Sequence, residues 1–310
     1  MKAEILLAAY NGAGYLPELL SSLAEQTDPS FTVRYQDDGS TDGTAELLAD
    51  WAERDRRFRA GREQGRHLGA KGNFLSLLRQ SEGDLVFLCD QDDIWTPEKV
   101  ETLIGVYRDA AERLPEGTPV LVHSDAVVVD ADDRVLAESF FRLQGWDQEA
   151  VTLNRLLVQN NVTGCTALLN RPLVDLAVRF AQPERMFMHD WFIALTAASF
   201  GRVFFCPLQL TRYRQHGGNV LGASRESLYR RALKALRFRD RARERIELTY
   251  THTQAFLEMV GKYLPPEAEE VIRDYLHTRS LPKWRRIAAW KRMGTLMQSP
   301  VTRLGQFFFG

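Results

Sequence analysis

The sequence contains little cysteine, no long apolar run and almost no net charge. Its three cysteines, Cys89, Cys165 and Cys206, lie too far apart for a disulfide framework or a zinc-binding spacing, so we expect reduced, buried thiols. No apolar stretch approaches about 18 residues, and the first residues lack the apolar core of a secretion signal. These shortages argue against a disulfide-stapled fold and a membrane-spanning helix, and we expect a cytoplasmic protein.

Charge is nearly balanced over the whole chain but uneven along it. The formal net charge of -1 gives no reason to expect a nucleic-acid partner. After about Gly222, Lys and Arg are roughly twice as many as Asp and Glu, which suits contact with anionic surfaces. We therefore predict a main domain over residues 1–222 and a basic, mainly helical extension over residues 223–310.

Apolar strands and helices alternate in the first part of the chain. The pattern predicts strands at Ile5–Ala9, Phe31–Tyr35 and Leu85–Cys89, and helices ending at Gln26 and spanning Thr44–Trp51 and Lys71–Gln80. Further on it predicts strands at Val120–His123, Val127–Val129, Asn161–Leu169 and Val203–Phe205, a helix at Asp190–Phe200, and a helical segment from Ser224. Such alternation is typical of an α/β fold with a mostly parallel sheet flanked by helices.

Polar and acidic turns follow the first three strands. They are Tyr10-Asn11-Gly12, the segment from Gln36 to Thr44, and Asp90-Gln91-Asp92-Asp93. Ligands of open α/β sheets bind beyond the carboxyl ends of the strands, so these turns are the expected site. Three carboxylates on one turn repel each other unless a cation compensates, and Mg²⁺ or Mn²⁺ prefers oxygen ligands. Acidic turns that merely cap helices are the alternative.

These turns, in this order, resemble the family 2 glycosyltransferases with the GT-A fold, most closely their bacterial rhamnosyltransferase-like members. The resemblance covers about residues 3 to 220. Later segments add to it, namely Asn161 to Thr166, Met188-His189-Asp190-Trp191, and Tyr213 to Val220.

The resemblance implies roles for individual residues. Asp190 matches the general base of the family, and Asp92 and His216 match its metal ligands. His216 lies among glycines and polar residues, so we do not expect it in the core, although it could be a surface loop residue. Asp190 could instead cap a helix. Contacts to the donor fall to Ala9, Tyr10, Asn11, Asp37, Asp38, Lys71, Asp90 and Gln91.

The implied activity is an inverting, metal-dependent transfer of a sugar, rhamnose or another deoxysugar, from a nucleoside diphosphate to a saccharide or lipid-linked acceptor in surface polysaccharide synthesis. The donor would then be a nucleotide sugar such as dTDP-rhamnose. The rival is a nucleotide-dependent oxidoreductase, because Gly12-Ala13-Gly14 follows the first strand, but Pro17 stands where a third small residue is needed. The glycine-rich signature of sugar nucleotidyltransferases is absent near the N-terminus of this sequence, which argues against that class of enzyme.

Basic and aromatic residues alternate near the end of the sequence. Trp284, Ile287, Ala288 and Trp290 lie among Lys283, Arg285, Arg286, Lys291 and Arg292, and Phe307, Phe308 and Phe309 follow. This composition suits peripheral contact with a membrane, and a non-catalytic membrane-surface protein is a third reading. Packing on the main domain or in a homo-oligomer is the alternative.

Overall fold

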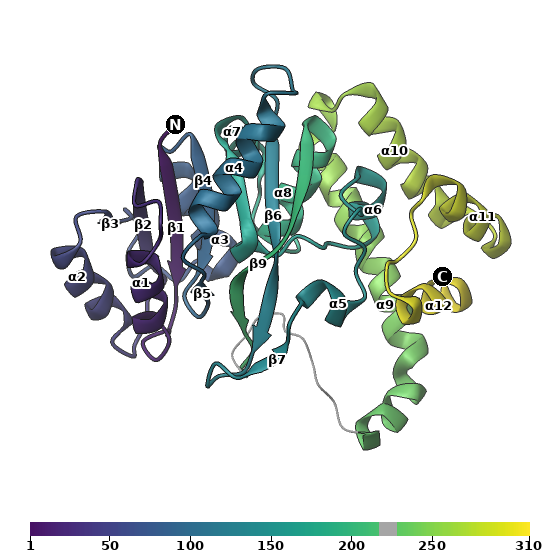
Figure 1. Ribbon diagram of the computed structural model, residues 1–310. Helices are drawn as coiled ribbons and strands as arrows, with labels where there is room; N and C mark the ends of the chain where they lie inside the picture. Colours follow the sequence, from purple (N-terminus) through teal and green to yellow (C-terminus); the bar gives the residue numbers. More distant parts are fainter. Residues whose placement is uncertain (217–227) are drawn as a thin grey trace.

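The computed structural model describes residues 1–216 and 228–310, and of residues 228–238 the backbone alone. Strands of the described chain form one nine-stranded sheet in the order β3-β2-β1-β4-β8-β6-β9-β5, with β7 paired to β6 (Figure 1). The strands are β1 (Ala3–Ala9), β2 (Phe31–Asp37), β3 (Phe58–Ala60), β4 (Leu85–Asp90), β5 (Ile94–Trp95), β6 (Val120–Val129), β7 (Val135–Ala137), β8 (Ala167–Asn170) and β9 (Arg202–Arg214).

The first half of the sheet is parallel. Strands β3, β2, β1 and β4 run in one direction, and the register aligns Ala9 with Asp37 and Ala8 with Asp90. All three strands that precede the polar turns therefore end at the same edge of the sheet. Burial on both faces explains their composition, since Ile5, Val33 and Phe87 are fully enclosed.

The second half of the sheet is mixed. Strand β8 pairs antiparallel with β4 and β6, whereas β6 and β9 are parallel. The two strands predicted at Val120–His123 and Val127–Val129 are one strand, β6, because the intervening polar residues stay in the ladder across a register shift at Ser124 and Asp125. The strand predicted at Asn161–Leu169 is shorter, since a 3₁₀ turn, η1 (Gly164–Thr166), precedes β8.

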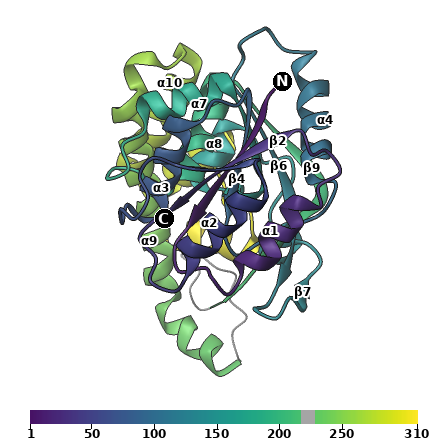
Figure 2. The ribbon, with the colours of Figure 1, turned by 90° about the vertical axis from the view of Figure 1, so that its left-hand side faces the viewer.

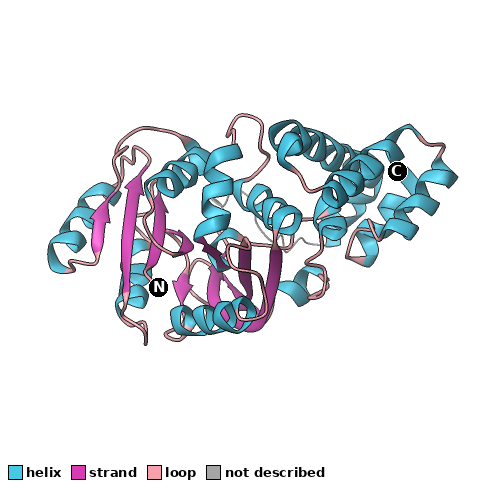
Figure 3. Cartoon of the chain, turned by 90° about the horizontal axis from the view of Figure 1, so that it is seen from above, coloured by secondary structure: helices cyan, strands magenta, loops and turns pink. Residues whose placement is uncertain are grey.

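Helices cover both faces of the sheet (Figures 2 and 3). They are α1 (Leu16–Ala24), α2 (Thr44–Arg54), α3 (Gly69–Gln80), α4 (Lys99–Ala111), α5 (Phe140–Gln144), α6 (Leu153–Val158), α7 (Arg171–Phe180) and α8 (His189–Phe200). One apolar core lies under α1, α2 and α4, and a larger one lies under α3, α7 and α8. The GT-A-type arrangement of a mostly parallel sheet flanked by helices is confirmed.

The C-terminal part is helical, as predicted. It contains α9 (Leu228–Val260), α10 (Pro266–His277), α11 (Lys283–Met293) and α12 (Pro300–Phe309), with 3₁₀ turns η2 (Gly261–Tyr263) and η3 (Thr278–Ser280). Residues Tyr250, Phe256, Ile272 and Trp290 belong to the same core as Leu6 of β1. The predicted boundary at Gly222 and the segment Gly217 to Val220 lie outside the described residues. No described helix is long and apolar enough to cross a bilayer.

Candidate functional site

The turn after β1 is tied to the turn after β4 by one side chain. The amide of Gln91 accepts a hydrogen bond from Tyr10 N (2.7 Å) and donates one to Tyr10 O (2.7 Å). Gly12 makes room for this clamp, because a Cβ atom there would lie 2.1 Å from Gln91 Oε1. The backbone near Ala9 and Tyr10, predicted to face the donor, is thus held rigidly, and the Tyr10 ring stays 45% exposed beside His67, 4.9 Å away between ring centres.

The turn after β1 is also tied to the turn after β2. Asn11, in the left-handed region at φ 49°, donates its N–H to Ser40 Oγ (2.8 Å) and accepts from Thr41 N with its side chain (2.9 Å). Asn tolerates this conformation better than most residues. The predicted donor-binding residues Asn11 and Gln91 therefore both position the site's backbone.

The paired carboxylates after β2 shape that turn from within. Asp37 accepts hydrogen bonds from the N–H groups of Gly39 and Ser40 and from the Ser40 hydroxyl. Asp38 accepts from Leu68 N (2.6 Å) and Gly69 N (2.8 Å), where α3 begins. Each carboxylate oxygen can accept two hydrogen bonds, so a base could still share either group.

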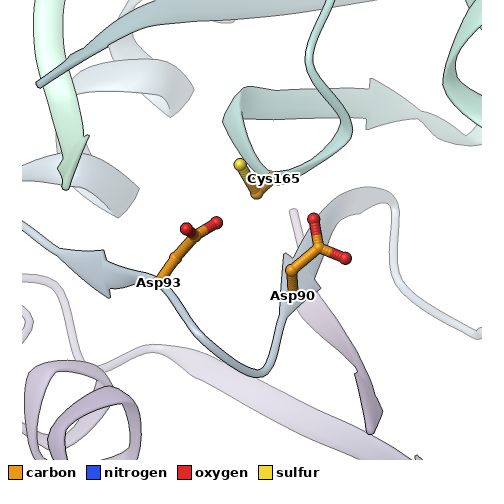
Figure 4. Close-up of side chains that lie close together, drawn as sticks. All are labelled: Asp90, Asp93 and Cys165. Carbon is orange, nitrogen blue, oxygen red and sulfur yellow. The ribbon is translucent and has the colours of Figure 1, made fainter. Parts of the chain in front are cut away.

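The acidic turn after β4 gathers carboxyl groups around a thiol (Figure 4). One ligand atom each from Asp90, Asp93 and Cys165 lies within 4.8 Å of the others. Burial, followed by the charges of Asp93 and Asp92, raises the pKa of Asp90 well above its ordinary value, and burial likewise raises the pKa of Asp93. The turn therefore holds negative charge at a cost that a cation would offset.

Asp92 and His216, the two predicted metal ligands, lie in contact. His216 Nε2 is 2.8 Å from Asp92 Oδ2, although the residues are 124 positions apart. Both side chains are 15% exposed, and the Tyr15 ring stacks on the imidazole at 4.6 Å. Carboxylate and imidazole thus meet at the edge of the sheet.

Sequence reasoning did not single out Arg214, which fixes the acidic turn. Its guanidinium donates to Asp92 O (2.9 Å) and Ala131 O (2.7 Å) and pairs with Glu18, and its backbone N–H donates to Asp93 Oδ1 (3.2 Å). The side chain is 2% exposed. Its place two residues before His216 was the available signal.

Lys99 is a second residue that the sequence did not reveal. Its buried ammonium donates to Cys165 O (2.6 Å) and Thr211 Oγ1 (2.8 Å) and lies 3.5 Å from the centre of the Trp95 ring. Burial lowers its pKa to about 8, while the neighbouring acidic groups, among them Asp93 and Asp90, act in the opposite direction. This cation links η1 to β9 beneath the acidic turn. Its partners are distant in the sequence, so no local pattern indicates this role.

Asp190 lies in the first turn of α8, directly against η1. Gly164 permits the approach, since a Cβ atom there would lie 3.1 Å from His189 Nε2 and 3.7 Å from the Cβ of Asp190. Burial raises the pKa of Asp190 to about 6, and hydrogen bonds from the N–H groups of Trp191 and Gly164 lower it in part. Helix α8 starts at His189 with Met188 at its N-cap, so Asp190 is not the cap.

Lys71 reaches toward the loop before α8 rather than toward the acidic turn. Its ammonium donates to Met186 O (2.7 Å). A cavity of about 590 Å³ lies here, lined by the start of α3 and by Pro183, Glu184, Phe187 and Met188. Contact between Lys71 and donor phosphate stays a prediction.

The residues of the acidic turn suit a hard divalent cation. Asp93 Oδ2 is buried without a hydrogen-bond partner among the described residues, and Asp92 and His216 add oxygen and nitrogen donors nearby. Burial raises the pKa of Cys165 well above its ordinary value, so it offers no thiolate and zinc is not favoured. Oxygen-preferring Mg²⁺ or Mn²⁺ fits this donor set.

Comparison with known proteins agrees with this geometry. The model of the family described as "Glycosyl transferase family 2" matches residues 4–114, which contain all three polar turns. Residues 4–114 are a family 2 glycosyl transferase domain.

Similar proteins extend the match beyond residues 4–114. An uncharacterized glycosyltransferase of Nostoc sp. (strain PCC 7120) is 26% identical over 71% of this chain and 66% of its own length. The dTDP-rhamnosyl transferase RfbG of Shigella flexneri is 24% identical over 70% of this chain and 74% of its own length. The chain thus spans just under two thirds of the Nostoc relative.

Solved structures share the fold. S. aureus TarS 1-349 in complex with UDP-GlcNAc has a TM-score of 0.57 and 20% identity, over 90% of this chain and 72% of that one. The mannosyltransferase PcManGT from Pyrobaculum calidifontis, in complex with GDP-Man and Mn²⁺, has a TM-score of 0.54 and 18% identity, over 97% and 77%.

Proposed function

We propose that this protein transfers a sugar from a nucleoside diphosphate donor to a hydroxyl group of an acceptor, with inversion at the anomeric carbon. The observation that carries the proposal is the meeting of Asp92 with His216 at the edge where Asp90, Asp93 and η1 also gather, with Asp190 against η1. Metal ligands and a carboxylate base are thus supplied by separate elements.

The donor is assigned to the edge formed by the turns after β1, β2 and β4. The exposed ring of Tyr10 offers a stacking surface for a base, and the free accepting capacity of Asp37 or Asp38 offers it hydrogen bonds. Asp90 would contact the ribose or the sugar of the donor. A bound Mg²⁺ or Mn²⁺, held by Asp92 and His216, would stabilise charge on the departing diphosphate.

Asp190 is assigned as the general base. Its carboxylate lies beside the acidic turn, partly exposed, with a pKa of about 6 that leaves it ionised and still basic at neutral pH. It would accept the proton of the attacking hydroxyl while the bond to the diphosphate breaks. A single displacement without a protein nucleophile gives inversion, which magnetic resonance of the first product would reveal.

Several finer points of the proposal come from the relatives. The dTDP-rhamnosyl transferase RfbG favours a donor such as dTDP-rhamnose, and the saccharide or lipid-linked acceptor stays a prediction. Peripheral membrane contact and a homo-oligomer stay predictions. An oxidoreductase is not favoured, because the space above Gly12, where a dinucleotide phosphate would approach, is filled by Gln91.

The proposal is tested through Asp92. Thermal stabilisation is measured for UDP, GDP and dTDP with and without Mn²⁺, and the best nucleotide is then titrated into Asp92→Asn and the exposed control Asp109→Asn. Since Asp92 is a proposed ligand and not a core residue, we expect the control to behave as wild type and Asp92→Asn to lose at least tenfold in Mn²⁺-dependent affinity. Unchanged affinity in Asp92→Asn would remove the proposed metal site.

A further inference from the structure

Helix α12 presents an apolar stripe to solvent. Val301, Leu304 and Phe308 are 61%, 52% and 63% exposed, and their spacing of three and four residues places them on one side of the helix. The opposite side is anchored, since Gln306 is buried there and its side-chain amide donates to Thr295 O (3.0 Å). The solvent-exposed face of a helix of this length normally carries polar side chains.

Trp284 of α11 adds to this stripe. It is 68% exposed, and the neighbouring Lys283 donates from its ammonium to Phe308 O (2.5 Å). The Lys291 ammonium lies 5.3 Å from the centre of the Phe307 ring, so the two helices contact each other through these side chains. Figures 1 and 3 place both helices at the opposite end of the molecule from β3.

The charge around the stripe has one sign. Residues 275–310 contain seven Lys or Arg and no Asp or Glu. Arg279 pairs with Glu247, whereas the other six make no ion pair with a carboxylate of the described residues. They are Lys283, Arg285, Arg286, Lys291, Arg292 and Arg303.

We propose that α11 and α12 form a docking face for an anionic lipid bilayer, with Trp284, Val301, Leu304 and Phe308 entering the interface and the basic side chains meeting headgroups. Aromatic and aliphatic groups flanked by Lys and Arg are the composition of interfacial helices. A second copy of the chain would bring like charges together. Nucleic acid would use the basic groups but leave the aliphatic stripe exposed.

This face also refines the membrane prediction made from the sequence. Trp290 was counted among the membrane-facing residues, but it is fully buried and donates its indole N–H to Thr278 Oγ1 (3.2 Å). Contact with lipid therefore falls to Trp284 and α12, and the proposal does not depend on the proposed sugar transfer.

The test is co-sedimentation of the full-length chain with vesicles of phosphatidylglycerol and phosphatidylcholine, and with vesicles of phosphatidylcholine alone. We expect binding to the anionic vesicles that falls at least tenfold between low and high salt. The double variant Leu304→Asn/Phe308→Asn should bind at least tenfold more weakly. The control Leu143→Asn/Leu208→Asn removes two leucines that are about half exposed elsewhere and should bind as wild type.

A charge variant, Arg285→Gln/Lys291→Gln/Arg292→Gln, should lose binding to the anionic vesicles to a similar extent. Equal losses in the leucine control, or no sedimentation at any phosphatidylglycerol content, would overturn the proposal. So would a stripe-dependent dimer in light scattering, or binding to a short DNA duplex that needs the stripe. Circular dichroism of each variant shows whether it is folded.

Discussion

Asp190, the proposed general base, opposes the stability of the fold when it is ionised. The Cβ of Asp190 lies against η1, 3.7 Å from the position that a Cβ atom on Gly164 would take, and burial raises the pKa of its carboxyl group. The unfolded chain ionises this group near its ordinary value of 3.8, whereas the folded chain ionises it near 6. The folded state is therefore penalised as pH rises from about 4 through 6, and the penalty is complete above that range.

We predict that Asp190→Asn retains donor affinity, loses at least a hundredfold in turnover, and stabilises the fold at pH 8. The neutral amide avoids the ionisation penalty, which is about 1–2 kcal/mol at roughly 1.36 kcal/mol per pKa unit once partial exposure is allowed for. Urea unfolding at pH 8 and pH 4 measures this gain, which should shrink at pH 4.

The pH dependence of the wild-type turnover rate gives a second test of Asp190. Because the ionised form is the proposed base, the pH profile should fall below about 6, and Asp109→Asn should keep both this profile and wild-type stability. Near-normal turnover in Asp190→Asn would eliminate the residue as base. A profile that is flat from pH 5 to 8 would do the same.

At the scale of elements, the junction between α8 and β9 depends on a glycine. Gly201 ends α8, and a Cβ atom there would lie 1.9 Å from Pro119 O, just before β6. The obstructing atom belongs to the backbone, and Arg202 N also donates to it at 2.9 Å. Substitution must therefore shift the start of two paired strands.

We predict that Gly201→Ala lowers the free energy of unfolding by about 2–3 kcal/mol, the cost of a backbone shift in a packed region. Gly105→Ala on α4 is the matched substitution, because nothing lies within 4 Å of its Cβ position, and it should raise stability by about 0.5–1 kcal/mol. Denaturant titration of both variants gives the comparison. Equal effects would mean that the contact with Pro119 is not limiting.

The strands that carry the site could be predicted from the sequence because each is a short apolar run closed by turn residues. Strand β6 was predicted as two pieces because Ser124 and Asp125 interrupt the apolar pattern. Their burial depends on distant partners, since Asp125 accepts from the Ser139 hydroxyl (2.5 Å) and from Phe141 N (3.1 Å). Local patterns do not contain that information.

The same distinction applies to the site residues. Motif order brought out the acidic turn and His216, because these residues sit in distinctive local segments. Lys99 and Arg214 act through contacts with residues 66 to 196 positions away, and an isolated Lys or Arg looks like any solvated charge. Their burial was predictable only from the folded chain.

At the scale of the whole molecule, one hydrophobic core contains residues from both sides of the domain boundary predicted at Gly222. Side chains of α9, α10 and α11 pack in the same cluster as α3, α7 and α8, and Trp290 and Ile272 are fully buried in it. Removal of the extension would expose this face of the main domain to water. The cost is large because each large apolar residue contributes about 1.5–3 kcal/mol.

We predict that a fragment of residues 1–222 is insoluble or binds the dye ANS, without a cooperative thermal transition. In the full chain, Trp290→Ala should cost about 3–5 kcal/mol, whereas Trp284→Ala at the exposed position should change stability by less than about 0.5 kcal/mol. Calorimetry and dye binding measure these effects. A fragment that melts like the full chain would establish two independent domains.

The continuous core also affects folding during synthesis, because its parts leave the ribosome at different times. Leu6 and Val86 emerge from the ribosome before the members of the same core around Trp290, which follow about 200 to 280 residues later, or roughly 10–60 s at typical elongation rates. During that interval the face that will receive α9 to α11 is apolar and uncovered. Nascent chains should therefore engage chaperones that shield apolar surface until the last helices arrive.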